Sequence, residues 1–233
     1  MRLILIRHGD PDYKNDCLTE LGKKQAAAVA QRLKDENIDV IYASTVGRAT
    51  ETATYTAELL NKKIIPLEFI REIDCDSVAG DENAPYRGSI DKITDSAVRD
   101  NVNVFVEHWQ DLECYKHTNA PKSYPQVSAG IDEFLEKLGF THKDRYFLCT
   151  RENTDTVAVF CHGNSSRAAI SRIFGIPFSV LCGCYQPRCT TVSVFEFESA
   201  PGKLILPKIG IINDSRHIDG LKKAQTFTSA HFL

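Results

Sequence analysis

The sequence lacks any long hydrophobic run, and this absence excludes membrane proteins first. No apolar stretch approaches the roughly 18 residues that a membrane helix needs. The stretch nearest the N-terminus, residues 3–6, is flanked by Arg2 and Arg7 and is too short for the hydrophobic region of a secretory signal. We therefore expect neither a membrane partner nor export, and predict a cytoplasmic protein.

An excess of positive charge is also missing. Lys and Arg number 28 against 31 Asp and Glu, which gives a net charge of -3 with neutral histidines. This balance argues against nucleic acid as a partner held by bulk positive charge. Repeats and low-complexity segments are absent too, and the hydrophobic share of 42% is ordinary for a globular protein. The composition thus predicts a folded globular protein.

Eight cysteines are present, and their meaning depends on the compartment. In a cytoplasmic protein they are better interpreted as reduced thiols than as a disulfide framework. Cys182, Cys184 and Cys189 lie close together in the sequence, but no fourth ligand stands at a spacing typical of zinc sites. We expect no metal and no cofactor.

Apolar runs alternate with amphipathic segments along most of the chain, which is typical of an α/β fold. Strands are expected at 2–6, 38–42, 63–65 (ended by Pro66), 156–160, 190–197 and 204–209. Helices are expected from an N-cap at Thr19 to Leu33 and at 48–60, 127–138 and 165–174. Pro201 and Gly202 indicate a hairpin between the last two strands. These elements predict a three-layer α/β/α sandwich with a mostly parallel central sheet and a late antiparallel edge.

The alternation stops between about residues 76 and 125. A length of 233 residues suits one domain with a sizeable insertion. We therefore predict a single domain, 1–233, in which 76–125 is an inserted cap over the carboxyl ends of the strands. Helices are expected within it at 89–100 and 103–113. Its aromatic and histidine side chains are expected to form a small core rather than line a substrate mouth: His108, Trp109, Tyr115 and His117.

The predicted carboxyl ends of the strands, where ligands bind in such folds, carry unusual side chains. Arg7 and His8 follow the first strand, Ser44 and Arg48 the second, and His162 the strand at 156–160. Two arginines beside two histidines would form a pocket for a phosphoryl dianion, since guanidinium groups bind phosphate oxygens bidentately. A histidine could then attack phosphorus.

The leaving oxygen in such a reaction needs a proton from an acid that stays protonated near neutral pH. Glu72, which lies just after the third strand, is the first candidate for this acid, and Asp74 is the second.

Arg7-His8-Gly9 at the end of a first strand resembles the signature of the histidine phosphatase superfamily, the phosphoglycerate-mutase-like fold. Further segments resemble the family in the expected order: 18–26, 44–53, 71–74, 159–163 and 213–217. Each alone is a weak signal, since an Arg-His-Gly tripeptide can be a surface turn. Their joint order at strand ends identifies the chain as a member.

The resemblance implies a role for each matching residue. His8 would be the nucleophile, oriented by a hydrogen bond from Nδ1 to a backbone carbonyl. Arg7 and Arg48 would clamp the phosphoryl oxygens, and His162 would complete the pocket. Glu72 would protonate the leaving oxygen and later activate water. The implied activity is hydrolysis of a phosphate monoester through a phosphohistidine, on a small phosphorylated substrate rather than a phosphopeptide.

Other substrate-binding residues are expected beside these. Gly163 follows His162 in the matching motif. Where many members place an Asn after the first motif, this chain has Lys14, with Asn15 one residue late, and both are candidates for substrate contact.

Two alternatives remain open from the sequence. A phosphoglycerate mutase is the first, but the extra basic contacts of mutases cannot be located in the insertion. A non-catalytic phospho-ligand-binding protein is the second, and the presence of all five pocket residues argues against it.

Cys161, next to His162, is interpreted as a packed strand residue; a thiol open to the pocket would make the enzyme sensitive to oxidation.

Overall fold

A six-stranded sheet forms the centre of the molecule in a computed structural model, which describes residues 1–221. The predicted domain extends further, and residues 222–233 lie outside the described part. The strands run in the order β11-β9-β1-β8-β4-β5. Their bounds are Arg2–Arg7 (β1), Val40–Ser44 (β4), Ile64–Leu67 (β5), Thr156–Cys161 (β8), Val192–Glu196 (β9) and Lys208–Asp214 (β11). Strands β1, β8, β4 and β5 are parallel neighbours, whereas β9 pairs antiparallel with both β1 and β11.

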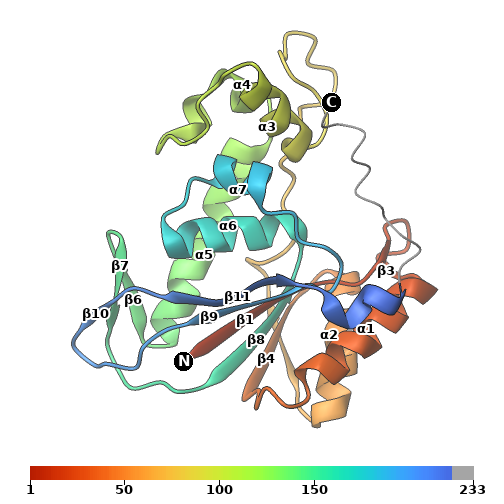
Figure 1. The fold of residues 1–233 in the computed structure, drawn as a ribbon, viewed down its shortest axis with the longest axis vertical. Coiled ribbons are helices and arrows are strands. Elements are labelled where there is room, and N and C mark those ends of the chain that lie inside the picture. The colour runs from red at the N-terminus through yellow and green to blue at the C-terminus, as the bar shows by residue number, and fades with distance from the viewer. Residues whose placement is uncertain (222–233) are drawn as a thin grey trace.

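Helices cover both faces of this sheet (Figure 1). Helices α1 (Glu20–Leu33) and α2 (Gly47–Leu60) lie on one face, and α5 (Ala120–Lys137) and α6 (Gly163–Phe174) on the other. Alternate side chains of β1 explain the two layers: Ile4 packs in the cluster with α1 and α2, whereas Leu3 and Leu5 pack in the cluster with α5 and α6. The predicted three-layer sandwich with its antiparallel edge is therefore confirmed.

The register of the sheet brings the carboxyl ends of β1, β8 and β4 together. Arg7 lies opposite Cys161, and Ala43 lies opposite Phe160. The residues that follow these strands, among them His8 and His162, consequently emerge side by side at one edge of the sheet. This edge is where the candidate site forms.

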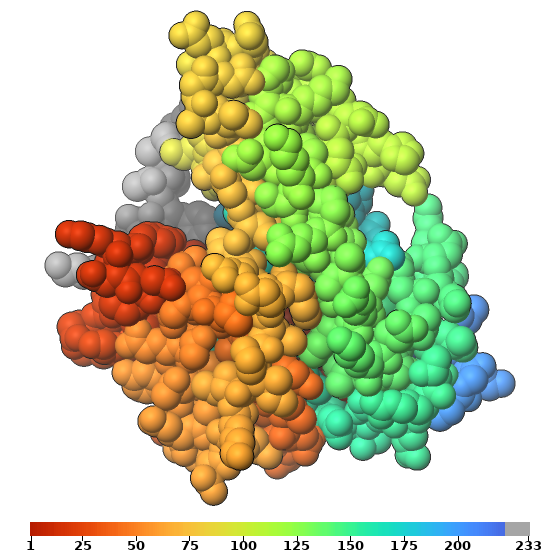
Figure 2. Space-filling model, turned by 180° about the vertical axis from the view of Figure 1, so that it is seen from behind, coloured from red at the N-terminus to blue at the C-terminus, as the bar shows by residue number. Residues whose placement is uncertain are grey.

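The segment between β5 and α5 extends the molecule beyond the sandwich, as the space-filling view also shows (Figure 2). Its first predicted helix is confirmed as α3 (Ile90–Arg99). The second, predicted at 103–113, is wrong: the structure has a 3-10 turn, η1 (Trp109–Asp111), and a short α4 (Glu113–Lys116), separated by the extended backbone of Leu112. The boundaries of the insertion and its covering of the pocket stay predictions.

Aromatic packing, rather than helical periodicity, organises this segment. Trp109 is buried and packs edge-on against Tyr115 and Tyr124. It also contacts Phe178 in α7 (Phe178–Cys184). Trp109 and Tyr115 are therefore core residues as predicted, but they belong to the large cluster that also contains Leu3 and Leu5. The core prediction is wrong for His108, which is exposed, and for His117, which is half-buried and bonds Asp81 and Glu113.

The C-terminal third differs most from expectation. The strand predicted at 204–209 is wrong as one element, since Pro207 separates β10 (Leu204–Ile205) from β11. Strand β10 pairs with a hairpin that the pattern did not indicate, β6 (Phe140–Lys143) and β7 (Tyr146–Cys149). Pro66 also does not end its strand, because β5 is an edge strand and tolerates a missing donor.

The remaining elements are short. Strands β2 (Pro11–Asp12) and β3 (Cys17–Leu18) form a small hairpin after His8, and η2 (Arg216–Leu221) ends the described chain. Within the described residues, no helix is both long enough and apolar enough to cross a membrane.

Candidate active site

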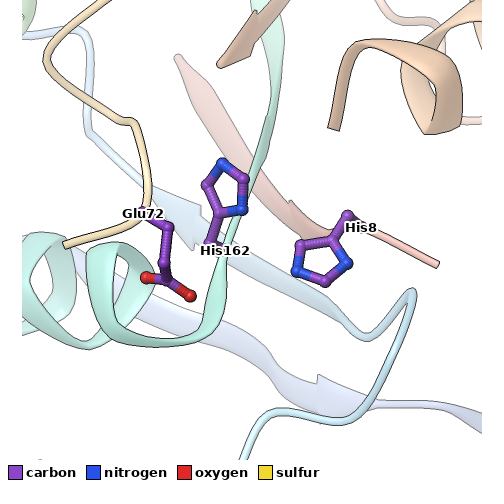
Figure 3. Close-up of side chains that lie close together, drawn as sticks. All are labelled: His8, Glu72 and His162. Atoms are coloured by element: carbon purple, nitrogen blue, oxygen red, sulfur yellow. The ribbon is translucent and has the colours of Figure 1, made fainter. Parts of the chain in front are cut away.

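Three of the predicted catalytic side chains meet at the carboxyl edge of the sheet (Figure 3). His8 follows β1, His162 follows β8, and Glu72 comes from the segment after β5. One ligand-type atom from each of the three lies within 4.8 Å of the others. Residues far apart in the sequence therefore form one compact cluster.

The His8 ring is held in a single orientation. Its Nδ1 lies 2.7 Å from the carbonyl oxygen of Gly9, which confirms the predicted backbone hydrogen bond. A carbonyl can only accept, so Nδ1 carries the proton and Nε2 keeps its lone pair. Burial, together with the charges of Arg7 and Arg48, lowers the pKa of His8 to about 3. The imidazole is consequently neutral and nucleophilic at physiological pH.

Two guanidinium groups flank this ring. Nη1 of Arg7 donates to the carbonyl of Pro187 at 2.5 Å, while its Nε is buried with no hydrogen-bond partner among residues 1–221. Nε of Arg48, near the start of α2, donates to Nε2 of His8 at 3.3 Å. A buried donor without a partner is costly, and an anionic oxygen in the pocket would satisfy it.

His162 forms the back of the pocket. Its Nε2 lies 2.8 Å from Oγ of Ser44, at the end of β4, and its Nδ1 is buried without a partner in the described part of the chain. Burial and the nearby His8 and Arg48 lower the pKa of His162 to about 2. Figure 3 shows the ring between His8 and Glu72, so its unpartnered nitrogen belongs to the site.

Of the two carboxyl groups predicted as the acid, Glu72 lies in the cluster with His8 and His162. Its Oε1 accepts hydrogen bonds from the backbone N–H groups of Ile73, Asn164 and Ser165. Burial raises the pKa of this carboxyl group, and the charge of Arg7 opposes the rise. Asp74, the second candidate, is exposed and accepts from Asp76 and Asn119 instead.

Gly163, the first residue of α6, borders the same pocket. A Cβ atom there would lie 3.8 Å from Cζ of Arg7 and 3.9 Å from Oε2 of Glu72. Any longer side chain at this position would therefore enter the space between Arg7 and Glu72. The position of Gly163 is compatible with the substrate-binding role that the sequence predicts.

Lys14 and Asn15 lie in an exposed turn between β2 and β3. Their backbone N–H groups both donate to Oδ1 of Asp12, and Nδ2 of Asn15 donates to Oδ2 of the same carboxylate. Among the described interactions, neither side chain contacts the catalytic cluster. Substrate contact by these two residues stays a prediction.

Sequence reasoning missed Asp16, although it touches the site. Its carboxylate accepts from Nη1 of Arg48 at 2.9 Å and from the N–H of Gly47 at 2.8 Å. The ring of Tyr13 also lies over Arg48, 5.3 Å from Cζ. No motif marks these loop residues, and Asp16 has a left-handed backbone (φ 49°).

The C-terminal motif supports the site from behind. Nδ2 of Asn213 donates to the carbonyl of Gln186, and Nε2 of His217 lies 3.1 Å from Oγ1 of Thr190. The N–H of Thr190 in turn donates to the carbonyl of His8. These contacts hold the segment that carries Pro187 against the end of β1.

The cluster could hold either a cation or an anion by its donor atoms alone. His8, Glu72 and His162 are side chains of the kinds that bind metal ions. Within residues 1–221, they form the single group of at least three such side chains close enough to share one ion. Two guanidinium groups beside them favour an anion, because they repel a divalent cation.

All eight cysteines are free thiols. Cys161 is fully buried in the core cluster, and burial raises its pKa to about 12, as expected for a packed strand residue.

Comparison with known sequences gives the same family as the motifs. A family model described as histidine phosphatase superfamily (branch 1) matches residues 3–208. Phosphoserine phosphatase 1 of Hydrogenobacter thermophilus is 39% identical over 215 residues, which cover 88% of this chain and 92% of that protein. A 2,3-bisphosphoglycerate-dependent phosphoglycerate mutase of Thermoplasma acidophilum is 30% identical over 125 residues, covering 47% and 60%.

Solved structures share the fold. A phosphoserine phosphatase from Entamoeba histolytica, in complex with 3-phosphoglyceric acid, matches with a TM-score of 0.60 and 24% identity over 93% of this chain and 98% of that one. A mycobacterial glucosyl-3-phosphoglycerate phosphatase matches with a TM-score of 0.60 and 17% identity, over 92% and 99%.

Proposed function

The chain belongs to the histidine phosphatase superfamily, and from this premise we propose that it hydrolyses a phosphate monoester through a phosphohistidine on His8. The observation that carries the proposal is the neutral His8 ring, with its Nε2 lone pair beside Arg48 and inside a pocket that Arg7 also borders. A nucleophile and a cationic clamp in one place suit attack on a phosphoryl dianion.

In the first step, Arg7, Arg48 and His162 hold the three phosphoryl oxygens. Nε2 of His8 attacks phosphorus and forms the N–P bond while the P–O bond to the leaving group breaks. Glu72 gives its proton to the departing oxygen, so that an alcohol leaves. The raised pKa of Glu72 keeps this proton available.

In the second step, the same groups transfer the phosphoryl group to water. Glu72, now a carboxylate, takes a proton from water, whose oxygen attacks phosphorus as the N–P bond breaks. Inorganic phosphate leaves, and both His8 and Glu72 return to their starting states. His8 and Glu72 thus act in both steps, and the chemistry described needs no added cofactor.

The substrate we propose is a small phosphorylated metabolite. The relative with the broadest sequence coverage described above is named a phosphoserine phosphatase, so O-phosphoserine is the first compound to test. We propose that a phosphopeptide is a less favoured substrate and that nucleic acid is not a partner. A cytoplasmic location is supported by the eight free thiols.

Mutase activity is the second candidate, because part of the chain is 30% identical to a phosphoglycerate mutase. We expect O-phosphoserine to yield serine and free phosphate, and 2- and 3-phosphoglycerate to interconvert little. Product analysis by phosphorus NMR separates the two reactions. Interconversion of the phosphoglycerates without phosphate release would contradict the hydrolase assignment, and phosphate binding without either reaction would favour a non-catalytic protein.

Asp16 is expected to weaken phosphate binding, because its carboxylate competes for Nη1 of Arg48. Asp16→Asn keeps the side-chain shape and removes the charge. We expect the product-inhibition constant for inorganic phosphate to fall about fivefold, the scale of a partly exposed ion pair.

The matched control for this substitution is Asp12→Asn in the same turn, since within the described residues the side chain of Asp12 bonds Lys14 and Asn15 and not Arg48. Equal inhibition constants in the two variants would refute competition by Asp16.

A further inference from the structure

Arg167 is a buried arginine of α6 that lies outside the catalytic cluster. Its side chain is only 6% exposed, and all three guanidinium nitrogens donate. Nε bonds the carbonyl of Tyr185 at 2.9 Å, Nη1 bonds Oδ1 of Asn164 at 2.9 Å, and Nη2 bonds Oε1 of Gln186 at 2.7 Å. One side chain thus joins α6 to the segment after α7.

The bond from Arg167 to Asn164 leads to Glu72. The backbone N–H of Asn164 donates to Oε1 of Glu72 at 3.1 Å, and its Nδ2 faces the carbonyl of Ile73 at 3.4 Å. Arg167 occupies Oδ1 of the same amide, which fixes the amide with Nδ2 toward Ile73. The acid and the start of α6 are therefore held together from both sides of Asn164.

The bonds from Arg167 to Tyr185 and Gln186 lead to Arg7. Tyr185 and Gln186, which Arg167 binds, directly precede Pro187, whose carbonyl accepts from Nη1 of Arg7. The short acceptor segment has little freedom once its carbonyl and amide are both bonded. Arg167 consequently determines where the carbonyl that orients Arg7 lies.

The charge of Arg167 forms no direct ion pair within the described residues, and it acts only at longer range on Asp76, where burial raises the pKa and Arg167 opposes the rise. Its three acceptors are all uncharged, and within the described residues no carboxylate lies within 4.0 Å of it. Burying an unpaired cation is destabilising unless another group compensates. A dianionic phosphoryl group in the adjacent pocket would add negative charge on the side of Glu72 and Arg7 when it binds.

We propose that Arg167 is a positioning residue that sets Glu72 and Arg7 at a fixed spacing and strengthens binding of the phosphoryl dianion. The catalytic part of this inference rests on the proposed function, whereas the effect on anion binding does not. Arg167 touches neither the reacting atoms nor the phosphate, and acts through Asn164 and the 185–187 segment.

The test compares Arg167→Met and Arg167→Lys with a matched control, Arg172→Met. Arg172 lies on the same helix and bonds Asp132 through Nε and Nη2, away from the site. Calorimetry with inorganic phosphate measures anion affinity without turnover. We expect about tenfold weaker binding in Arg167→Met, a smaller loss in Arg167→Lys, which keeps the charge, and none in the control.

The pH profile is the readout that a merely structural role would not move. Arg7 and Arg48 face Glu72 and lower its pKa, as do the N–H groups of Ile73 and Ser165. The thiols of Cys75 and Cys161 also face it, but burial raises their pKa values and keeps them neutral. In Arg167→Met the loosened N–H of Asn164 stabilises the Glu72 carboxylate less. Glu72 then keeps its proton longer, so the alkaline limb of kcat/KM should move to higher pH.

Asn164→Ala provides a second variant if Arg167→Met does not fold, since it removes one link and keeps Arg167. Weaker phosphate binding by the Arg167 variants, or a shifted alkaline limb in Asn164→Ala, supports the positioning role. Affinity and profiles equal to those of Arg172→Met in all variants overturn it. A wild type that binds phosphate but hydrolyses no monoester refutes the proposed function, while the affinities still decide the role of Arg167.

Discussion

Replacing His8 with alanine is expected to lower kcat/KM for phosphate monoesters by about 10⁴-fold or more. The substitution removes the atom that bonds phosphorus, while Arg7 and Arg48 remain. Inorganic phosphate should therefore still bind, and a steady-state assay combined with calorimetry separates the two effects. The loss should be the same for every substrate, because each needs the N–P bond.

His142→Ala is the matched control for this variant. His142 lies in the β6–β7 hairpin against Phe147, away from the site. We expect nearly unchanged turnover there. Substantial phosphatase activity in His8→Ala, at a melting temperature equal to that of the wild type, would refute the nucleophilic role.

Replacing Glu72 with glutamine is the second large effect, and its size should depend on the leaving group. Glutamine keeps the shape of the side chain but has no acidic proton. Alkyl phosphates, whose alkoxides leave poorly, should lose about 10²- to 10⁴-fold in kcat, whereas aryl phosphates such as p-nitrophenyl phosphate should lose much less. The ratio of the two rates is the quantity to measure.

The pH dependence follows from the same proton. Burial raises the pKa of Glu72, and the first step needs its protonated form. The kcat/KM of the wild type should therefore fall as pH rises through this raised pKa, and the limb should disappear in Glu72→Gln. Asp74→Asn, two residues away and exposed, should keep both the rate and the limb. Equal losses for alkyl and aryl substrates would remove Glu72 from the role of acid.

The strand ends were predictable because their signals are local. The apolar runs that become β1 and β8 are short and unbroken, and parallel strands must bring their carboxyl ends to one edge. His8 and His162 follow these runs directly, so their meeting follows from topology. Glu72 could be named as a carboxyl group just after the third predicted strand, and the order of the motifs supported it, but its segment has no periodic pattern that predicts its contacts.

Contacts between loops could not be predicted in the same way. Asp16 reaches Arg48 from a turn that the sequence marks only as polar, and Arg167 looks like an exposed helical residue although it is 6% exposed. Its acceptor Gln186 is 19 residues away in the sequence, beyond any helical spacing. Such pairings depend on tertiary packing, which periodicity does not report.

The same limit explains the missed hairpin of β6 and β7. Charged residues at its tip interrupt the alternation, and the turn uses Asp144 with a φ of 55° rather than a glycine. Its inner side is nevertheless firmly packed, because Phe140 and Phe147 both contact Phe197. A strand of four residues with one buried face leaves little pattern to detect.

The most direct test is to trap the phosphorylated enzyme. The wild type, mixed with labelled O-phosphoserine or an aryl phosphate and quenched in alkali within milliseconds, should carry one phosphoryl group that is stable in base and labile in acid. Peptide mapping by mass spectrometry should place it on His8 and find none in His8→Ala. A burst of alcohol that precedes phosphate release should accompany it. Turnover without any phosphorylated protein, or a phosphoryl group on another residue, would contradict the account.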